Sequence, residues 1–273
     1  MLPPDPVASE SAPPSWPLLD QLERLGQAAY FAFQATLLLP SVLRRPGQLF
    51  SQLFHILLGA LPLGITAGVS IGVVVWMHLR EALRTVGGPG AVQYLPQALS
   101  LAVVLEFAPI AAGLLAAGRT GASLGAELGS MRLTEQIDAP EVLGLSPLRE
   151  LVVPRLAACM LALPILSLFI TYLALSAGYA AEALGGSMTW RQYVNECLRV
   201  LYLHDVIPAT LKTVVFGYLI GLVGCWKGMH AGGGTEGVGR AATGGVVGSI
   251  LLVLVADVVL VKAIQLFSLP SHL

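Results

Sequence analysis

Charge is scarce in this sequence. Only 11% of its 273 residues are Asp, Glu, Lys or Arg, whereas an average soluble domain has about 25%. Apolar residues make up 55% of the chain, and the mean hydropathy is +0.77. This composition excludes an ordinary soluble domain and indicates a membrane protein with about five or six crossings of roughly 20 residues each. The formal net charge of −1 gives no sign of a nucleic-acid partner.

Cysteine is scarce as well. Cys159, Cys197 and Cys225 are too few and too widely spaced for a disulfide framework or a zinc site. The five histidines are scattered along the chain and form no pair four residues apart. We therefore expect no metal site and no catalytic residue.

A phosphate-binding loop is also missing, because G-x-x-x-x-G-K-[ST] occurs nowhere in the sequence. We expect this chain to bind no ATP and no other cofactor. Gly232, Gly234 and Gly237 do match G-x-G-x-x-G, but the match follows a membrane segment and not the strand of a βαβ unit. We interpret it as a flexible cytoplasmic loop.

The N-terminal region differs in composition from the rest. Residues 1–17 are rich in proline and serine, are acidic and lack the features of a secretion signal, so we expect a disordered cytoplasmic tail. Residues 18–45 have apolar side chains at helical spacing with charges between them, and they end at Arg44-Arg45-Pro46. This pattern predicts an amphipathic helix in the membrane interface.

Five apolar runs are long enough to span a bilayer. Ile56–Met77 and Leu156–Ala181 are uncharged, while each of the other three contains one ionisable residue. We expect spanning helices at about 54–80, 92–118, 153–181, 206–228 and 241–264. Lysine and arginine are more frequent in the segments that share a side with the N-terminus, which places the N-terminus in the cytoplasm and the C-terminus outside.

Small residues recur every four positions along two of the runs. One stripe is formed by Gly64, Gly68 and Gly72, and the other continues from Gly113 and Ala117 to Gly121, Gly125 and Gly129. Such stripes allow helix backbones to approach closely in a membrane. The pattern favours packing within the chain over a subunit interface, but it leaves both open.

Residues 118–150 form the longest polar stretch, on the predicted cytoplasmic side. Thr134–Asp138 has the pattern of a short amphipathic helix. A solvated loop and a docking surface for another protein are both compatible with this composition. The charged residues of the stretch are Arg119, Glu127, Arg132, Glu135, Asp138, Glu141, Arg149 and Glu150.

The run G-R-T-G-A-S-L-G-A-E-L-G-S-M-R-L-T-E-Q-I-D-A, followed by E-V-L-G, resembles the signature of the MlaE/YrbE permeases. These are the membrane subunits of ABC transporters that work with MCE proteins on lipids. The interfacial helix, the five crossings, the glycine-rich loop G-x-G-R-A-A-T at 237–243 and the outward C-terminus also fit. The resemblance implies an all-α integral membrane protein that forms a homodimer in the bacterial inner membrane. It further implies a separate ATPase subunit, an MCE-domain protein at the outer face and a lipid substrate.

For the polar stretch, the resemblance implies a coupling helix at about 131–144 that sits in a groove of the ATPase. The family usually has leucine where this chain has Pro140. Because proline interrupts helical hydrogen bonding, we expect the helix to end or kink near Asp138. The residues expected to couple to the ATPase are Glu127, Arg132, Glu135, Gln136, Ile137, Asp138 and Glu141.

Three ionisable residues lie within the spans: Glu106, Lys212 and Asp257. Each costs about 2.5–3.5 kcal/mol on insertion scales, so we expect each to have a role. All three fall between the middle and the outer half of the membrane, where Lys212 can neutralise one carboxylate. The resemblance places them around a central lipid cavity. A helix-locking ion pair and direct contact with lipid headgroups remain alternatives, and Leu105, where the family can have arginine, argues against headgroup contact at that position.

Two further hypotheses follow from the same charges. Glu106, Lys212 and Asp257 would suit the proton relay of an ion-coupled secondary carrier, although five crossings do not divide into equal inverted halves. An intramembrane enzyme with paired carboxylates is a third reading, but no nucleophile or metal cluster accompanies them. On the outer side, Leu184–Asp205 is expected either to contact the MCE partner or to form a simple interfacial segment.

Overall fold

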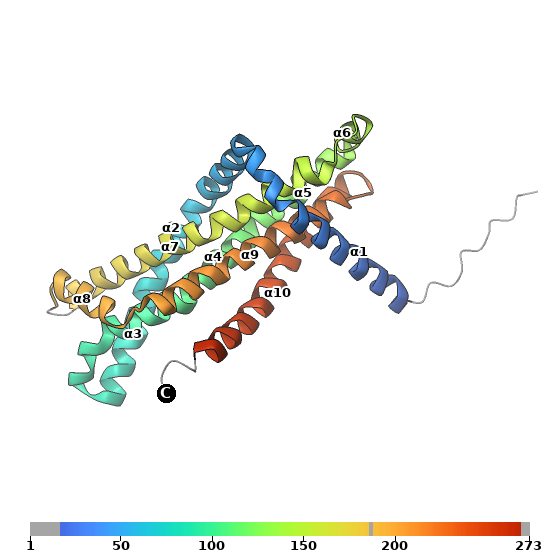
Figure 1. Ribbon diagram of the computed structural model, residues 1–273. Coiled ribbons are helices and arrows are strands. Elements are labelled where there is room, and N and C mark those ends of the chain that lie inside the picture. The colour runs from blue at the N-terminus through green and yellow to red at the C-terminus, as the bar shows by residue number, and fades with distance from the viewer. Residues whose placement is uncertain (1–16, 186–187, 269–273) are drawn as a thin grey trace, which may run out of the picture.

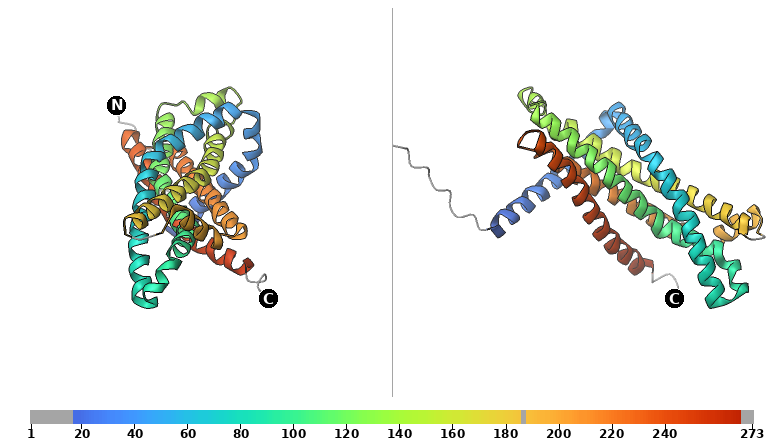
Figure 2. Two further views of the ribbon diagram at one scale, coloured as in Figure 1. Left: turned by 90° about the vertical axis from the view of Figure 1, so that its left-hand side faces the viewer. Right: turned by 180° about the vertical axis from the view of Figure 1, so that it is seen from behind.

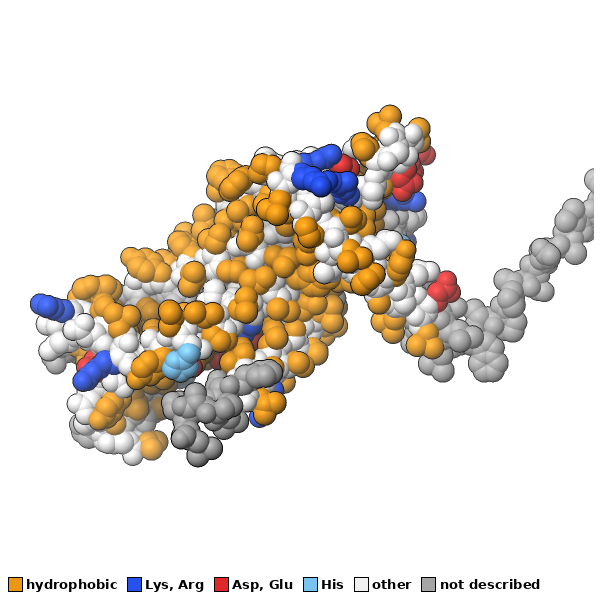
Figure 3. Space-filling model, viewed as in Figure 1, with side chains coloured by type: hydrophobic (Ala, Val, Ile, Leu, Met, Phe, Trp, Pro, Cys, Tyr) orange, Lys and Arg blue, Asp and Glu red, His pale blue; other side chains and the backbone are white. Residues whose placement is uncertain are grey.

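The computed structural model describes residues 17–185 and 188–268, and this part of the chain consists of helices joined by short turns and connections, without strands (Figure 1). The predicted tail at 1–17 therefore lies outside the described residues except for Pro17. Apolar side chains cover the visible length of the bundle, while charged side chains lie mainly toward its ends (Figure 3).

Five helices are long and apolar enough to cross a membrane, as the sequence predicted. They are α2 (Pro46–Gly87), a second span over Gly90–Leu133, a third over Leu148–Gly185, α9 (Leu203–Met229) and α10 (Gly234–Ser268). The second span combines η2 (Pro89–Tyr94), α3 (Leu95–Ala102), η3 (Val103–Phe107), α4 (Ala108–Ala116), η4 (Ala117–Gly121) and α5 (Ala122–Leu133). The third combines η5 (Leu148–Val152) and α7 (Val153–Gly185).

Every span is longer than the sequence predicted. The second, at 44 residues, would be about 66 Å long at a rise of about 1.5 Å per residue, roughly twice the hydrocarbon thickness. The apolar runs define only the segment in contact with lipid, whereas the helical hydrogen bonds continue into polar sequence. We call the end of the bundle that carries 134–147 and 230–233 the loop end (Figure 2). The opposite end carries 88–94 and the helix α8 (Trp190–Val200), and we call it the α8 end.

The predicted interfacial helix is α1 (Pro17–Leu38), followed by the 3-10 helix η1 (Leu39–Arg44). It projects from the side of the bundle (Figure 1). Phe31 is buried and packs edge-on against Trp226 of α9 at 5.2 Å between ring centroids, and the hydroxyls of Thr36 and Tyr218 lie 2.7 Å apart. Several other apolar side chains of α1 are exposed: Leu22, Leu25, Phe33 and Leu37.

Both glycine stripes lie at contacts within the chain. A Cβ atom at Gly72 would overlap the backbone of Ala174 in α7, and one at Gly68 would lie 2.8 Å from the Leu173 Cβ atom. The second stripe faces α10: a Cβ at Gly125 would lie 2.6 Å from the carbonyl oxygen of Ala241. A Cβ at Gly121 would lie 3.1 Å from the carbonyl oxygen of Gly245, and one at Gly129 would lie 3.6 Å from the Cα atom of Val238. Close backbone approach therefore joins α2 to α7 and the second span to α10.

Gly72→Ala is expected to destabilise the protein by about 2 kcal/mol, because overpacking against backbone forces the helices apart. Gly239→Ala is the matched control, since it also lies inside a helix but a Cβ there meets no atom within 4 Å. It should stabilise α10 by up to about 1 kcal/mol through helix propensity. Thermal unfolding of the two purified variants in detergent measures the difference. Equal unfolding midpoints would mean that Gly72 does not pack tightly against α7.

One predicted loop is a helix. The G-x-G-R-A-A-T sequence at 237–243 lies inside α10, whose first residue is Gly234, so the connection between α9 and α10 is only 230–233. Gly233 and Gly234 have positive φ angles, which glycine adopts easily. The flexible-loop prediction was therefore wrong for 237–243, because contact of α10 with α5 stabilises a helix that glycine content alone disfavours.

The segment at 184–205, which the sequence predicts on the outer side, contains a further helix, α8 (Trp190–Val200). The Thr189 side chain and the Gln192 side chain form a capping box at its start. Tyr193 and Cys197 are buried in the same apolar cluster as Leu99 of α3. Burial raises the pKa of the Cys197 thiol to about 11, so the thiol remains protonated at neutral pH.

Candidate functional site

The three intramembrane charges meet. Lys212 of α9 places its Nζ atom 2.8 Å from Oε2 of Glu106 and 3.1 Å from Oδ1 of Asp257. Glu106 belongs to the second span and Asp257 to α10, so the ammonium joins three helices. The sequence predicted one neutralised carboxylate, whereas the structure pairs Lys212 with both.

The three groups differ in exposure. The Lys212 side chain is 1% exposed and that of Asp257 is 12% exposed, but that of Glu106 is 40% exposed. A buried ammonium requires a partner, and here it has two. Two carboxylates and one ammonium leave a formal charge of −1, and Glu106 presents that charge at the surface of the spanning bundle. The arrangement is an ion-pair lock with one accessible carboxylate, so it is compatible with both alternatives from the sequence.

The helix around Glu106 is locally irregular. Val103–Phe107 forms a π-type segment, η3, and Ala117–Gly121 forms another, η4. Such wide turns rotate the side chains that follow them and occur often at functional sites. The residues of η3 thus keep Val103 and Val104 buried while the Glu106 side chain remains partly exposed.

The residues expected to couple to an ATPase separate into two groups. Glu127 lies with its Oε1 atom 2.5 Å from Nη2 of the buried Arg155, and Arg132 Nη1 lies 2.7 Å from Oδ1 of Asp138. Ile137 is fully buried. These four residues, Glu127, Arg132, Ile137 and Asp138, contact other parts of their own chain. The remaining three, Glu135, Gln136 and Glu141, are exposed, and their side chains form no ion pair or hydrogen bond with another described residue.

The predicted coupling segment at 131–144 is not one helix. α5 ends at Leu133, residues 134–137 form a turn, and α6 (Asp138–Val142) begins after it. The short helix predicted at Thr134–Asp138 was therefore wrong. Glu135 has a φ angle of 58°, which is rare for a residue with a side chain. The break lies before Asp138, so Pro140 falls in the first turn of α6, where its missing N–H leaves no hydrogen bond unmade.

The loop end carries an apolar surface that the sequence reasoning missed. Its members are exposed to between 45% and 87%, and they lie beside the exposed carboxylates of the loop. The signal was present in the sequence as an apolar run between polar residues, V-L-G-L at 142–145. We call this surface the loop-end patch; it consists of Leu133, Val142, Leu143 and Leu145.

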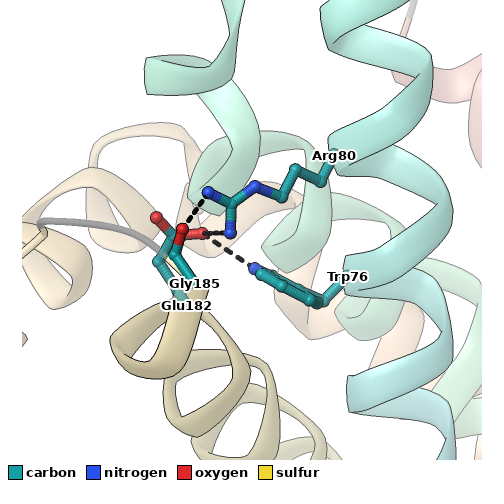
Figure 4. Close-up of polar contacts among 4 residues, drawn as sticks. All are labelled: Trp76, Arg80, Glu182 and Gly185. Carbon is teal, nitrogen blue, oxygen red and sulfur yellow. Dashed lines mark hydrogen bonds and ion pairs between the residues drawn. The ribbon is translucent and has the colours of Figure 1, made fainter.

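A second polar cluster was also missed, at the α8 end (Figure 4). The Trp76 indole donates a hydrogen bond of 2.9 Å to Glu182 Oε2, and Arg80 Nη1 lies 3.4 Å from the same oxygen. Arg80 also donates to the carbonyl oxygen of Gly185 and lies over the Trp76 ring at 5.0 Å. The cluster joins α2 to α7. Sequence reasoning counted Arg80 only as a flanking charge, and Glu182 lies just beyond the uncharged run that ends at Ala181.

Glu182→Ala is expected to lower the free energy of unfolding by about 3 kcal/mol, because it leaves Arg80 partly buried without its carboxylate. The side chains of Arg80 and Glu182 are only 12% and 7% exposed. Glu236→Ala removes a solvent-exposed pair with Arg240 and should cost less than about 1 kcal/mol. Thermal unfolding in detergent compares the two variants. An equal loss of stability in both would contradict the prediction.

Comparison with known proteins gives one family. The family model described as Permease MlaE matches residues 49–263. A probable ABC transporter permease protein of Rickettsia typhi is 37% identical over 157 residues, which is 58% of this chain and 61% of the relative. One from Synechocystis is 35% identical over 199 residues, covering 71% of this chain and 72% of the relative.

A chloroplast protein of Arabidopsis thaliana, named TRIGALACTOSYLDIACYLGLYCEROL 1, is 36% identical over 166 residues, or 59% of this chain and 46% of that protein. The match to the Rickettsia relatives spans about three fifths of their length. The family match covers most of the spanning bundle, including the ion-pair lock and the loop-end patch. The chain therefore belongs to the MlaE permease family.

Proposed function

We propose that this chain is the membrane subunit of an ABC transporter that moves phospholipid or a related lipid. In this proposal, a separate ATPase subunit binds at the loop end, and ATP is hydrolysed there and not on this chain. An MCE-domain protein exchanges lipid at the α8 end. The chain functions as a homodimer in the bacterial inner membrane, with its N-terminus in the cytoplasm and its C-terminus outside.

The observation that carries the proposal is the loop-end patch on a chain of the MlaE permease family. Leucine and valine side chains exposed together at the end of a spanning bundle cannot be covered by lipid if they lie beyond its apolar run, and exposed apolar patches mark sites of protein association. Val142 and Leu143 are 87% and 75% exposed, and Glu135 and Glu141 are exposed beside them. An ATPase groove with an apolar floor and a basic rim would complement this surface.

Two features support a lipid substrate. A groove of about 450 Å³ between α2 and α7 is lined only by apolar side chains, among them Phe50, Phe54, Ile165 and Phe169, and it suits an acyl chain. The Arabidopsis relative carries the name of a galactolipid. The half-exposed Glu106 adds a polar contact at a different level of the bundle.

A dimer is supported by the burial of the spans. In α2 and α10, fewer residues are buried within the chain than in the other three spans. Their exposed side chains include Ile65, Val69, Val255 and Val258. Such faces are covered in a membrane by lipid or by another helix, so a second copy has room to pack there. Cross-linking through cysteines introduced on α2 and α10 of the full chain identifies which face meets the other copy.

Purification of the chain with and without its partner tests whether ATP is hydrolysed on a separate subunit. The chain alone is expected to hydrolyse no ATP, whereas its complex with the partner ATPase in lipid nanodiscs hydrolyses ATP and responds to lipid. Hydrolysis by the purified chain alone, or failure to form any complex with an ATPase encoded beside it, would overturn the proposal.

An ion-coupled secondary carrier is the second candidate, and the observation that favours it is the convergence of Glu106, Lys212 and Asp257. Carboxylates joined by an ammonium inside a membrane are typical of proton pathways. This candidate requires lipid movement on a proton gradient in the absence of ATP, which the transporter proposal excludes.

A further inference from the structure

Arg119 stands apart from the other cations of the chain. Among the lysines and arginines whose side chains the structure describes, it is the one that is not fully exposed and yet has no ion pair. No hydrogen bond joins its guanidinium to another described residue either. The unpaired cations that remain, Arg44, Arg84, Arg149, Arg191, Lys227 and Lys262, are all exposed.

The position of the guanidinium is defined by α2. It lies against the backbone of Gly59, in the space that a Cβ atom of that residue would occupy. Any larger residue at 59 would displace it, so the absence of a side chain on α2 accommodates the charged group. Arg119 therefore does not extend freely into solvent as an exposed arginine does; it is held between the second span and α2.

The residue before Arg119 in the chain faces open space. A Cβ atom added to Gly118 would meet no other atom within 4 Å, and Gly118 is exposed. His55 lies one helical turn before Gly59 on the same face of α2 and is also exposed. Arg119 at Gly59 and His55 one turn before it thus offer donors from both helices to a ligand at the surface.

The chemistry of the group that fits here follows from these donors. A guanidinium presents five N–H groups in a planar fork that matches the oxygens of a phosphate. These donors have no partner among the described residues, and none of them is fully buried, so an anion at the surface can reach them. Glu106 lies about 20 Å away along the second span, at about 1.5 Å per residue, and Asp257 of α10 shares its Lys212 partner. The excess negative charge of these two carboxylates disfavours an anion at their own level.

We infer that Arg119, seated on Gly59, binds the phosphate of a phospholipid headgroup in the half of the spanning bundle nearer the loop end. The source is a lipid because apolar side chains of α2 are exposed around this level, among them Leu58 and Leu63, and because the apolar run of the second span ends at Gly118. A headgroup phosphate lies at such a boundary. The inference rests on the proposed lipid transport and assigns it a headgroup contact separate from the ion-pair lock.

Native mass spectrometry of the purified full chain tests this site. The probes are phosphatidylglycerol, diacylglycerol with the same acyl chains and inorganic phosphate. The wild type should bind phosphatidylglycerol more tightly than diacylglycerol. Arg119→Ala should weaken phosphatidylglycerol binding about tenfold, the loss of one charge-assisted hydrogen bond or more, and should leave diacylglycerol binding unchanged.

Two further variants keep a positive charge at position 119, so they test lipid binding without removing that charge from the folded protein. Arg119→Lys should recover part of the affinity, because a lysine keeps the charge but not the bidentate fork. Gly59→Ala should weaken phosphatidylglycerol binding with Arg119 intact. Arg84→Ala, an exposed arginine near the α8 end, is the control and should bind as the wild type does. Thermal unfolding of each variant reports whether it is folded, and if Arg119→Ala is not, the lysine and Gly59 variants decide the question.

Unchanged phosphatidylglycerol binding in folded Arg119 and Gly59 variants would overturn the inference. Displacement by inorganic phosphate, with no preference for the phospholipid over diacylglycerol, would overturn the lipid assignment in favour of a soluble anion. Either result leaves the transporter proposal standing if ATP-driven lipid movement by the wild type persists. Absence of that movement in the wild type would instead contradict the proposed function, whatever Arg119 binds.

Discussion

Lys212→Met is expected to lower the free energy of unfolding by about 3–5 kcal/mol, because removal of one partner leaves buried charge uncompensated. The ammonium is 1% exposed and lies between Glu106 and Asp257. Without it, two carboxylates from different helices repel each other in a region of low dielectric constant. Methionine retains most of the volume of the side chain, so the loss measures charge and not a cavity. Thermal unfolding in detergent, together with yield of folded protein, gives the result.

The control removes all three charges at once. Lys212→Met combined with Glu106→Gln and Asp257→Asn should recover most of the lost stability, because replacing a complete buried ion network with neutral groups is often close to neutral. If the single variant is as stable as the wild type, the lock does not hold the helices together. If the triple variant is as unstable as the single one, the loss is due to packing.

The triple variant also separates the two roles that the geometry allows. A folded triple variant that still moves lipid would assign the charges to locking alone. A folded variant that has lost lipid movement, while its complex still hydrolyses ATP, would assign them to contact with the substrate or with protons. Partial exposure of Glu106, at 40% of its side chain, makes that carboxylate the one through which such contact would occur.

Val142→Asp combined with Leu143→Asp is expected to weaken binding of the ATPase subunit by at least about 100-fold, which corresponds to about 2.7 kcal/mol. Both side chains belong to the loop-end patch and contribute its most exposed apolar surface. Aspartate at these positions would place desolvated charge in the interface. Co-purification and ATP hydrolysis of the complex in nanodiscs measure the loss.

Val86→Asp is the matched control for that variant. It changes the same residue type at 90% exposure, but it lies near the end of α2, away from the loop end. Binding and hydrolysis should remain as in the wild type. Full lipid-stimulated hydrolysis by the Val142 and Leu143 double variant would mean that the ATPase does not use the loop-end patch.

The five spans could be predicted from sequence because the thickness of the bilayer requires a long run of apolar residues for each crossing. Their full lengths could not, since helical hydrogen bonding in α5 and α10 continues where the sequence turns polar. The common depth of Glu106, Lys212 and Asp257 also followed from position along the spans. Their pairing could not be predicted, because it depends on which way each of the three helices faces. The π-type segment η3 changes the direction in which Glu106 points.

The loop end was harder to predict. Glutamate favours helices, so the sequence indicated a helix through Glu135, where the chain adopts a positive φ angle. The turn is stabilised by contacts that no local pattern reveals: the burial of Ile137 and the ion pair of Arg132 with Asp138. The Trp76, Arg80 and Glu182 cluster was missed for the same reason, because it depends on which helices pack together.

ATP-dependent lipid movement tests the account most directly. The chain, reconstituted with its ATPase and MCE partners in proteoliposomes of known orientation, is expected to move a fluorescent phospholipid only when ATP is supplied to the loop-end face. A proton gradient without ATP should have no effect. Lipid movement that follows the proton gradient, by this chain without an ATPase, would contradict the account and support an ion-coupled carrier.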